Sequence, residues 1–169
     1  MKNKNDIVVF GGGCFWCTEA VFKELKGVIS VMPGYAGGPS TSSGQVPTYE
    51  EVCTGQTGHA EAVEVEYDPQ RVSYETLLNL FWEIHDPSSL DRQGPDIGTQ
   101  YRSAIFFHLP EQQSLALDSK EKLALSRKFK TPIVTQIVPA ATFYPAEEYH
   151  QRYLEKQGIT HCGLPRQQE

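Results

Sequence analysis

Residues 7–17, IVVFGGGCFWC, hold the first strand, the first turn and the first helix that the sequence predicts. The apolar run 7–10 is typical of a short buried strand, and the three glycines 11–13 end it in a turn. The helical pattern then begins at Cys14 and ends near Leu25. A cysteine is therefore expected where a glycine-rich turn meets the start of a helix.

Periodic apolar patterns continue along the rest of the chain. They predict strands at 28–31, 61–67, 101–108 and 133–138, and helices at 73–84, 110–128 and 146–156. The stretches 33–57 and 85–98 are rich in loop-forming residues and are expected to be loops. Strands and helices do not alternate strictly, so we expect an α+β fold with one mixed sheet packed with helices. Its expected form is a two-layer, ferredoxin-like α/β sandwich.

The length of 169 residues fits one domain over 1–169, with 1–5 and a mobile C-terminal tail at 158–169 expected to be flexible. The net charge of −6 argues against nucleic acid as a partner, because phosphate binding needs clustered cations. The sequence has no run of eighteen apolar residues, so we expect no membrane span. The first residues do not resemble a signal peptide. We expect a cytoplasmic protein that acts as a monomer.

Cys14 is the strongest candidate for a reactive group. The partial positive charge of a helix N-terminus favours the thiolate, which is the nucleophilic form of cysteine. The alternative is a small buried apolar residue. Cys14 and Cys17 also form a C-x-x-C pair, which serves disulfide exchange, zinc binding or haem attachment. Thr18 in place of histidine argues against haem, and the distant, isolated Cys53 and Cys162 argue against zinc.

Four other side chains have two interpretations each. Phe15 and Trp16 are either core residues or an apolar wall for a substrate beside Cys14. Glu61 begins the strand 61–67, where a carboxyl group near an apolar pocket can have a raised pKa and donate a proton; the alternative is an ordinary exposed glutamate. Asp96 lies in a polar loop and is either a site residue or part of a surface turn. Cys53 is expected to be a buried bystander.

Five stretches together resemble the methionine sulfoxide reductase A family, the peptide-methionine (S)-S-oxide reductases. They are GGGCFWC at 11–17, GYAGG at 34–38, PTYEEVCTGQTGHAEAVEVEYDP at 47–69, FWEIHDP at 81–87 and RQGPDIGTQYRSAIF at 92–106. The similarity runs from about Phe10 to Cys162, and its motifs are specific in combination.

The resemblance implies a function and a role for each matching residue. Cys14 matches the nucleophile, Glu61 the acid that protonates the sulfoxide oxygen, and Tyr49 and Tyr101 the phenols that hydrogen-bond this oxygen. Asp96 matches an aspartate of the same polar pocket. Phe15 and Trp16 match the aromatic walls that hold the methyl group of the substrate.

The implied substrate is the S epimer of methionine sulfoxide, free or in proteins, and the implied reaction repairs oxidative damage. Thiolate attack leaves a sulfenic acid on the nucleophile, a second cysteine converts it into a disulfide, and thioredoxin or a similar dithiol restores the thiols. No metal and no organic cofactor is implied.

The chain departs from the family pattern at three positions. Cys17 stands where many members have glycine, Ile97 where many have histidine, and His161 where tyrosine is common. Cys162 matches a resolving cysteine of the family, and Cys17 is a second candidate for this role. The order in which the two would act stays open.

Two other functions stay open on the residues alone. A general thiol–disulfide oxidoreductase would use Cys14 and Cys17 and would have no use for Glu61. A zinc or interaction module would bind metal in stoichiometric amounts and unfold with a chelator.

Overall fold

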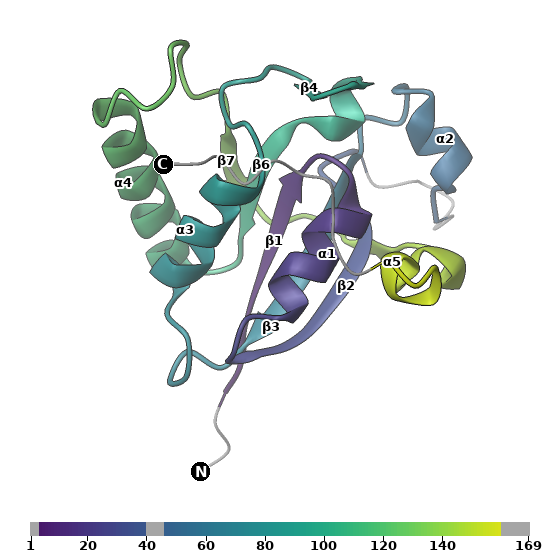
Figure 1. Ribbon diagram of the computed structural model, residues 1–169, viewed down its shortest axis with the longest axis horizontal. Coiled ribbons are helices and arrows are strands. Elements are labelled where there is room, and N and C mark those ends of the chain that lie inside the picture. Colours follow the sequence, from purple (N-terminus) through teal and green to yellow (C-terminus); the bar gives the residue numbers. More distant parts are fainter. Residues whose placement is uncertain (1–3, 40–45, 160–169) are drawn as a thin grey trace.

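The computed structural model describes residues 4–39 and 46–159 (Figure 1). Six strands form one sheet in the order β7-β6-β1-β3-β2-β8. Their bounds are β1 (Asp6–Gly12), β2 (Val28–Ala36), β3 (Ala60–Tyr67), β6 (Ser103–Phe107), β7 (Gln136–Pro139) and β8 (Tyr144–Pro145). The β6–β7 pair is parallel and the other pairs are antiparallel, so the sheet is mixed.

The helices and a small hairpin complete the chain between these strands. The α-helices are α1 (Phe15–Lys23), α2 (Tyr49–Cys53), α3 (Tyr74–Ile84), α4 (Pro110–Leu125) and α5 (Tyr153–Lys156). Two 3-10 turns are η1 (Thr99–Tyr101) and η2 (Glu148–His150), and the hairpin pairs β4 (Arg92–Gln93) with β5 (Asp96–Ile97). The result is a single α+β domain, which confirms the expected fold class.

The larger core lies between the sheet and the helices that cover one of its faces. Figure 1 shows α1 and α3 on the same side of the sheet. Phe10 of β1 stacks on Phe22 of α1 with ring centroids 5.0 Å apart, and it packs against the tilted ring of Phe81 of α3 at 4.8 Å. All three rings are fully buried, and each contributes roughly 2–3 kcal/mol through the apolar surface it removes from water. This packing holds α1, and with it the Gly–Cys turn, against the sheet.

Helix ends follow the local sequence where a capping residue is present. Ser73 accepts a hydrogen bond from the backbone N–H of Thr76 and caps α3. Thr48 and Glu51 form a capping box that starts α2 inside the stretch 33–57. The prediction of an uninterrupted loop at 33–57 was wrong, because β2 extends to Ala36 and α2 follows.

The predicted helix 146–156 is also not observed as one helix. The chain instead forms η2 and then α5, separated by Arg152 in a left-handed backbone conformation with φ of 54°. A non-glycine residue adopts this conformation only where surrounding contacts favour it. In this arrangement, His150 of η2 contacts Trp16 of α1 and Tyr49 of α2.

In the described part of the chain, no helix is both long enough and apolar enough to span a bilayer. The expected mobile tail falls mainly on residues 160–169, which lie outside the described residues.

Candidate active site

Four strands begin or end at the same end of the sheet. Because neighbouring strands are antiparallel, β1 ends where β3 and β6 begin: Phe10 pairs with Val63, and Gly12 pairs with Ser103. In the same way, Tyr35 near the end of β2 pairs with Glu61 at the start of β3. This topology brings Cys14, which follows β1, to the same end of the sheet as Glu61 near the start of β3 and Tyr101 just before β6.

Cys14 is the N-cap residue of α1 and is half-buried. The turn before it needs glycine at Gly13, whose φ is 92°. A Cβ atom at Gly13 would lie only 2.8 Å from Cγ of Gln93, so the turn packs directly against the β4–β5 hairpin. The structure thus confirms the expected position of Cys14 at the junction of turn and helix, as a free thiol.

The pKa of the Cys14 thiol differs from the expectation of a lowered value. The backbone N–H groups of Trp16 and Cys17 do lower it, as a helix N-terminus should. Burial and then the negative charge of Glu61 outweigh them and raise the pKa from 9.0 to about 11. The expectation from the helix N-terminus alone was wrong because it ignored desolvation and the neighbouring carboxyl group.

Glu61 is 1% exposed, and burial raises its pKa from 4.5 to about 8. The charge of Asp96 raises it further, whereas the backbone N–H of Phe15 and the Tyr101 phenol lower it. Among the described residues, its Oε2 atom has no hydrogen-bond partner although it is buried. A carboxyl group of this kind is mostly protonated at neutral pH and can donate to a ligand oxygen. The alternative of an exposed strand-edge glutamate is excluded.

Tyr101 and Asp96 lie on the same side as Glu61. Burial raises the pKa of the half-buried Tyr101, and the charges of Glu61, Cys53, Asp96 and Cys14 raise it further. Asp96 in β5 is close enough for its charge to raise the pKa values of Cys14 and Glu61. The phenol of Tyr101 therefore stays a hydrogen-bond donor at any physiological pH.

Tyr49 begins α2, and its phenol donates a hydrogen bond to the side chain of Cys53. Burial and this hydrogen bond raise the pKa of Tyr49, as does the nearby charge of Glu61. Cys53 is exposed, so the expectation of a buried bystander was wrong. Its thiol lies at the rim of the site, where it contacts one of the predicted site residues.

Phe15 and Trp16 have different surroundings. Phe15 is 1% exposed and belongs to the core, with its ring 5.8 Å from that of Tyr35 and 6.2 Å from that of Tyr49. Trp16 is half-buried, and its ring stacks on Tyr153 of α5 with centroids 3.8 Å apart. Trp16 is therefore the aromatic side chain that faces outward beside Cys14, and Phe15 lies beneath it.

Sequence reasoning missed Glu147 and His150, which the structure brings into contact with the predicted site. Trp16 Nε1–H donates to Nδ1 of His150 at 3.0 Å. Glu147 accepts hydrogen bonds from the Tyr35 phenol and from the backbone N–H of Tyr49, both at 3.0 Å. Trp16 and His150 are 134 residues apart, and the single-helix interpretation of 146–156 gave no reason to place them together.

The structure describes one of the two candidate resolving cysteines. Cys17, in the first turn of α1, is disulfide-bonded. Cys162 lies outside the described residues. Within residues 4–39 and 46–159, no group of three or more His, Cys, Asp or Glu side chains is arranged to hold a metal ion.

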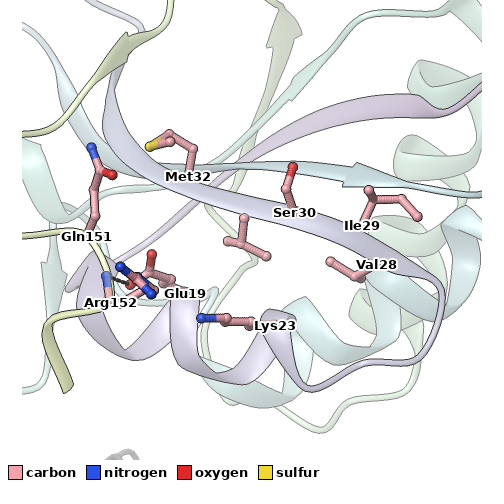
Figure 2. A pocket seen from close by; sticks show the side chains of 9 residues that line it. Glu19, Lys23, Val28, Ile29, Ser30, Met32, Gln151 and Arg152 are labelled. Carbon is pink, nitrogen blue, oxygen red and sulfur yellow. Dashed lines mark hydrogen bonds between the residues drawn. The ribbon is translucent and has the colours of Figure 1, made fainter. Parts of the chain in front are cut away.

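A groove of about 280 Å³ lies beside α1, between this helix, β2 and the segment that leads into α5 (Figure 2). It contains none of the predicted site residues. At one end, the backbone N–H of Arg152 donates to Oε1 of Glu19 at 2.8 Å. Glu19 is 3% exposed, and burial raises its pKa. This contact fixes the C-terminal segment against α1 next to the site.

Comparison with known proteins adds a family to this geometry. Residues 6–169 match the family model described as peptide methionine sulfoxide reductase. A curated relative from Geobacter metallireducens, named peptide methionine sulfoxide reductase MsrA, is 58% identical over 154 residues. The match covers 91% of this chain and 93% of the relative.

Solved structures agree with the fold. Mxr1 from Saccharomyces cerevisiae in its reduced form matches with a TM-score of 0.88 and 36% identity, over 98% of this chain and 92% of that chain. Mxr1 in complex with Trx2 matches with a TM-score of 0.62 and 26% identity, over 90% of this chain and 87% of that chain.

Proposed function

This chain belongs to the peptide methionine sulfoxide reductase family, and we propose that it reduces the S epimer of methionine sulfoxide with Cys14 as nucleophile and Glu61 as acid. The substrate is methionine sulfoxide, free or in peptides and proteins, and the product is methionine. The enzyme is thus an oxidoreductase that repairs oxidised methionine.

The observation that carries the proposal is the pairing of Cys14 with a buried, mostly protonated Glu61. A sulfoxide oxygen leaves sulfur only when it is protonated or strongly polarised. The Glu61 carboxyl, with a pKa of about 8 and a buried Oε2 that lacks a partner among the described residues, fits this requirement. A general disulfide oxidoreductase has no need for such an acid.

In the first step, the Cys14 sulfur attacks the sulfoxide sulfur while Glu61 protonates the oxygen. The phenols of Tyr49 and Tyr101 hydrogen-bond the same oxygen, and Asp96 raises the pKa of Glu61 so that it keeps its proton. Because Glu61 is already protonated at neutral pH, its charge does not oppose ionisation of Cys14, and the polarised sulfoxide sulfur of the bound substrate favours the Cys14 thiolate further.

Atoms and electrons balance in this step. The S–O bond of the sulfoxide breaks and an S–O bond forms at Cys14, which becomes a sulfenic acid. The substrate sulfur gains two electrons and leaves as the thioether, and Cys14 loses two. The thiol proton of Cys14 replaces the proton that Glu61 donates. Trp16, with Phe15 beneath it, contacts the methyl group on the substrate sulfur.

Recycling needs a second thiol and an external reductant. A resolving cysteine, Cys162 or Cys17, condenses with the sulfenic acid, releases water and forms a disulfide. Thioredoxin or a similar dithiol then reduces this disulfide. The resemblance of the sequence to a thioredoxin-dependent family supports this partner, as does the solved complex of the similar Mxr1 with Trx2. We propose a cytoplasmic location, because a thiol enzyme that is recycled by a dithiol works in a reducing compartment.

The experiment that tests the proposal compares two substrates in one assay. NADPH consumption is followed with thioredoxin reductase and thioredoxin, using either a methionine sulfoxide peptide or insulin as the oxidised substrate. We expect turnover of the peptide that is lost in Cys14→Ser, and no acceleration of insulin reduction over thioredoxin alone. Reduction of insulin without reduction of the sulfoxide would favour a general thiol–disulfide oxidoreductase instead.

We also propose the finer description of the fold as ferredoxin-like. The order β6-β1-β3-β2, with antiparallel neighbours and with α1 after β1 and α3 after β3, supports it. A β-α-β-β-α-β chain with this strand order is the split βαβ arrangement.

A further inference from the structure

The loop between α4 and β7 is positively charged in an otherwise acidic chain. Between Glu121 and Glu147 the sequence has no aspartate or glutamate. It has four cations there, Lys122, Arg127, Lys128 and Lys130. All four are exposed, and in the described part of the chain no carboxylate lies within ion-pair distance of them. Because the whole chain has a net charge of −6, the loop carries a local charge of the opposite sign.

The topology places this cationic loop at the same end of the sheet as Cys14. β7 runs parallel to β6, and its first residue, Gln136, pairs with Ala104 near the start of β6. Tyr101 of the candidate site lies just before β6, so the loop that leads into β7 lies at the site end of the sheet. Figure 1 shows this loop at the same end as the β4–β5 hairpin. β7 is the second strand from β1, which is about 10 Å at the usual strand spacing.

Two buried hydrogen bonds connect the end of the cationic loop to the glycine turn of the site. Thr135 Oγ1 lies 2.7 Å from Oγ of Ser103, and this Oγ lies 2.7 Å from Nε2 of His85. The His85 ring packs against the turn, because a Cβ atom at Gly12 would lie 3.4 Å from its Cγ. A typical protein interface covers about 800 Å² of each partner. A protein seated over the site therefore also covers this loop.

Exposed apolar side chains lie at the same end of the molecule. Of the described residues, the three most exposed large apolar side chains are Leu125 at 73%, Leu90 at 71% and Ile97 at 69%. Leu125 ends α4, Leu90 lies in the loop after α3, and Ile97 belongs to the β4–β5 hairpin. Val134 N–H donates to the Pro87 carbonyl at 2.8 Å, so the loops after α3 and after α4 run side by side. Exposed apolar side chains with charged groups at their rim are typical of protein-binding surfaces.

We propose that these residues form a docking face for the protein dithiol that recycles the enzyme, and that this dithiol protein has an acidic surface around its reactive cysteines. The docking face consists of Leu90, Ile97, Leu125, Arg127, Lys128 and Lys130. The inference rests on the proposed function, because it concerns the partner of the recycling step. The apolar side chains provide the area of contact, and the cations attract the partner.

The reductant fits this surface better than the substrate does. Methionine sulfoxide occurs in peptides and proteins of every charge, and a fixed positive charge beside the site would repel those with basic surfaces. The reductant is a single protein that must reach the disulfide in every cycle. Opposite charges on the two surfaces can therefore speed every encounter.

The test measures reduction of the disulfide that includes Cys17, without any sulfoxide. The oxidised full-length chain is mixed with reduced thioredoxin of net negative charge, and the loss of thioredoxin thiols gives a second-order rate constant. Dithiothreitol, a small uncharged dithiol that needs no docking face, is the comparison reductant. Both reductants are used at low ionic strength and in about 1 M salt, where the screening length is about 3 Å.

Two double variants change the charge of the docking face. Lys128→Glu with Lys130→Glu reverses two charges, and Lys128→Gln with Lys130→Gln only removes them. Lys26→Glu with Arg71→Glu is the matched control, because it reverses two exposed cations near the opposite end of the sheet, where β2 begins and β3 ends. At low ionic strength we expect reduction by thioredoxin to slow roughly tenfold in the Glu pair and about threefold in the Gln pair. In about 1 M salt, both effects should shrink to within about twofold.

The apolar part of the docking face is tested on one helix. Leu125→Gln should slow reduction by thioredoxin about threefold at both salt concentrations, because the contact that it removes is not screened. Leu117→Gln, at another exposed leucine of α4, is its control and should leave the rate unchanged. Reduction by dithiothreitol should stay within about twofold in every variant, which also shows that the variants fold.

The other outcomes would overturn the inference. Equal slowing with dithiothreitol would mean that the disulfide itself had changed. Equal slowing in the control pair would mean that net charge matters rather than position. A loss confined to acidic sulfoxide peptides, with reduction by thioredoxin unchanged, would assign the surface to the substrate instead. An unsubstituted chain that reduces no sulfoxide would refute the proposed function alone, because this assay contains no sulfoxide.

Discussion

Replacing Glu61 by glutamine should slow catalysis and make the protein more resistant to alkaline unfolding. The folded chain holds the Glu61 carboxyl at a pKa of about 8, against 4.5 for an exposed glutamate, mainly because it is buried. Below pH 4.5 the carboxyl is protonated in both the folded and the unfolded chain, so it adds no pH dependence there. As the pH rises to about 8, the unfolded chain releases this proton and the folded chain keeps it, so stability falls.

The size of the effect follows from the two pKa values. Each pKa unit corresponds to about 1.4 kcal/mol, so the full loss above pH 8 is about 5 kcal/mol. Between pH values of about 5.5 and 9, the loss is about 3 kcal/mol. Glutamine fills a similar volume and does not titrate. The advantage of Glu61→Gln in free energy of unfolding should therefore grow by about 3 kcal/mol over this range.

The assay is equilibrium unfolding in urea at several pH values, with and without Glu61→Gln. Both chains carry Cys14→Ser, so that the thiol with a pKa of about 11 does not contribute. The slopes against denaturant should agree, so that the midpoints report stability. Parallel curves of stability against pH for the two chains would refute the raised pKa of Glu61 and, with it, the assignment of the neutral acid.

Catalysis and reactivity of the same variant should change in opposite directions when Cys14 is present. Loss of a general acid should slow single-turnover sulfoxide reduction by about a hundredfold or more. The charge of Glu61 raises the pKa of Cys14, so Glu61→Gln should lower it and speed alkylation of Cys14 at alkaline pH. Slower alkylation would indicate a disrupted site rather than a missing acid.

Tyr101→Phe should slow the single turnover by about tenfold through the loss of one hydrogen bond to the oxygen, while Tyr74→Phe, at a buried phenol of α3, should leave the rate unchanged. Gly13→Ala should lower the free energy of unfolding by about 1–3 kcal/mol, because φ is 92° and the new Cβ would lie 2.8 Å from Gln93; an unchanged urea midpoint would contradict this. Cys162→Ser should allow one turnover and impair recycling by thioredoxin in the NADPH assay, so unimpaired steady-state turnover would remove this residue from the resolving role.

Local sequence patterns predicted the strands and helices whose formation needs no contact with distant parts of the chain. The alternation at 61–67 predicted β3, and the glycine turn before Cys14 predicted the start of α1, because both signals need no distant partner. The helix predicted at 146–156 failed for the opposite reason. Its break at Arg152 accompanies contacts with α1, which lies more than a hundred residues earlier.

The site was predictable in its members but not in its electrostatics. Cys14 and Glu61 were identified from residue type and motif, yet the direction of the Cys14 pKa depends on burial and on the charge of Glu61. Burial of Cys14 and its proximity to Glu61 arise only when β1 pairs with β3 and brings the two residues to the same end of the sheet. Glu147 and His150 were missed because their significance lies in contacts with Trp16, Tyr35 and Tyr49, which no local pattern reveals.

The most direct test of the central claim is a single turnover of the reduced chain with the separate S and R epimers of a methionine sulfoxide peptide. We predict one equivalent of thioether from the S epimer alone, together with a sulfenic acid or disulfide at Cys14, and no product in Cys14→Ser. Thioether from the R epimer at a similar rate would contradict the stereochemical claim. Equal product in Cys14→Ser would contradict the assignment of Cys14 as the nucleophile.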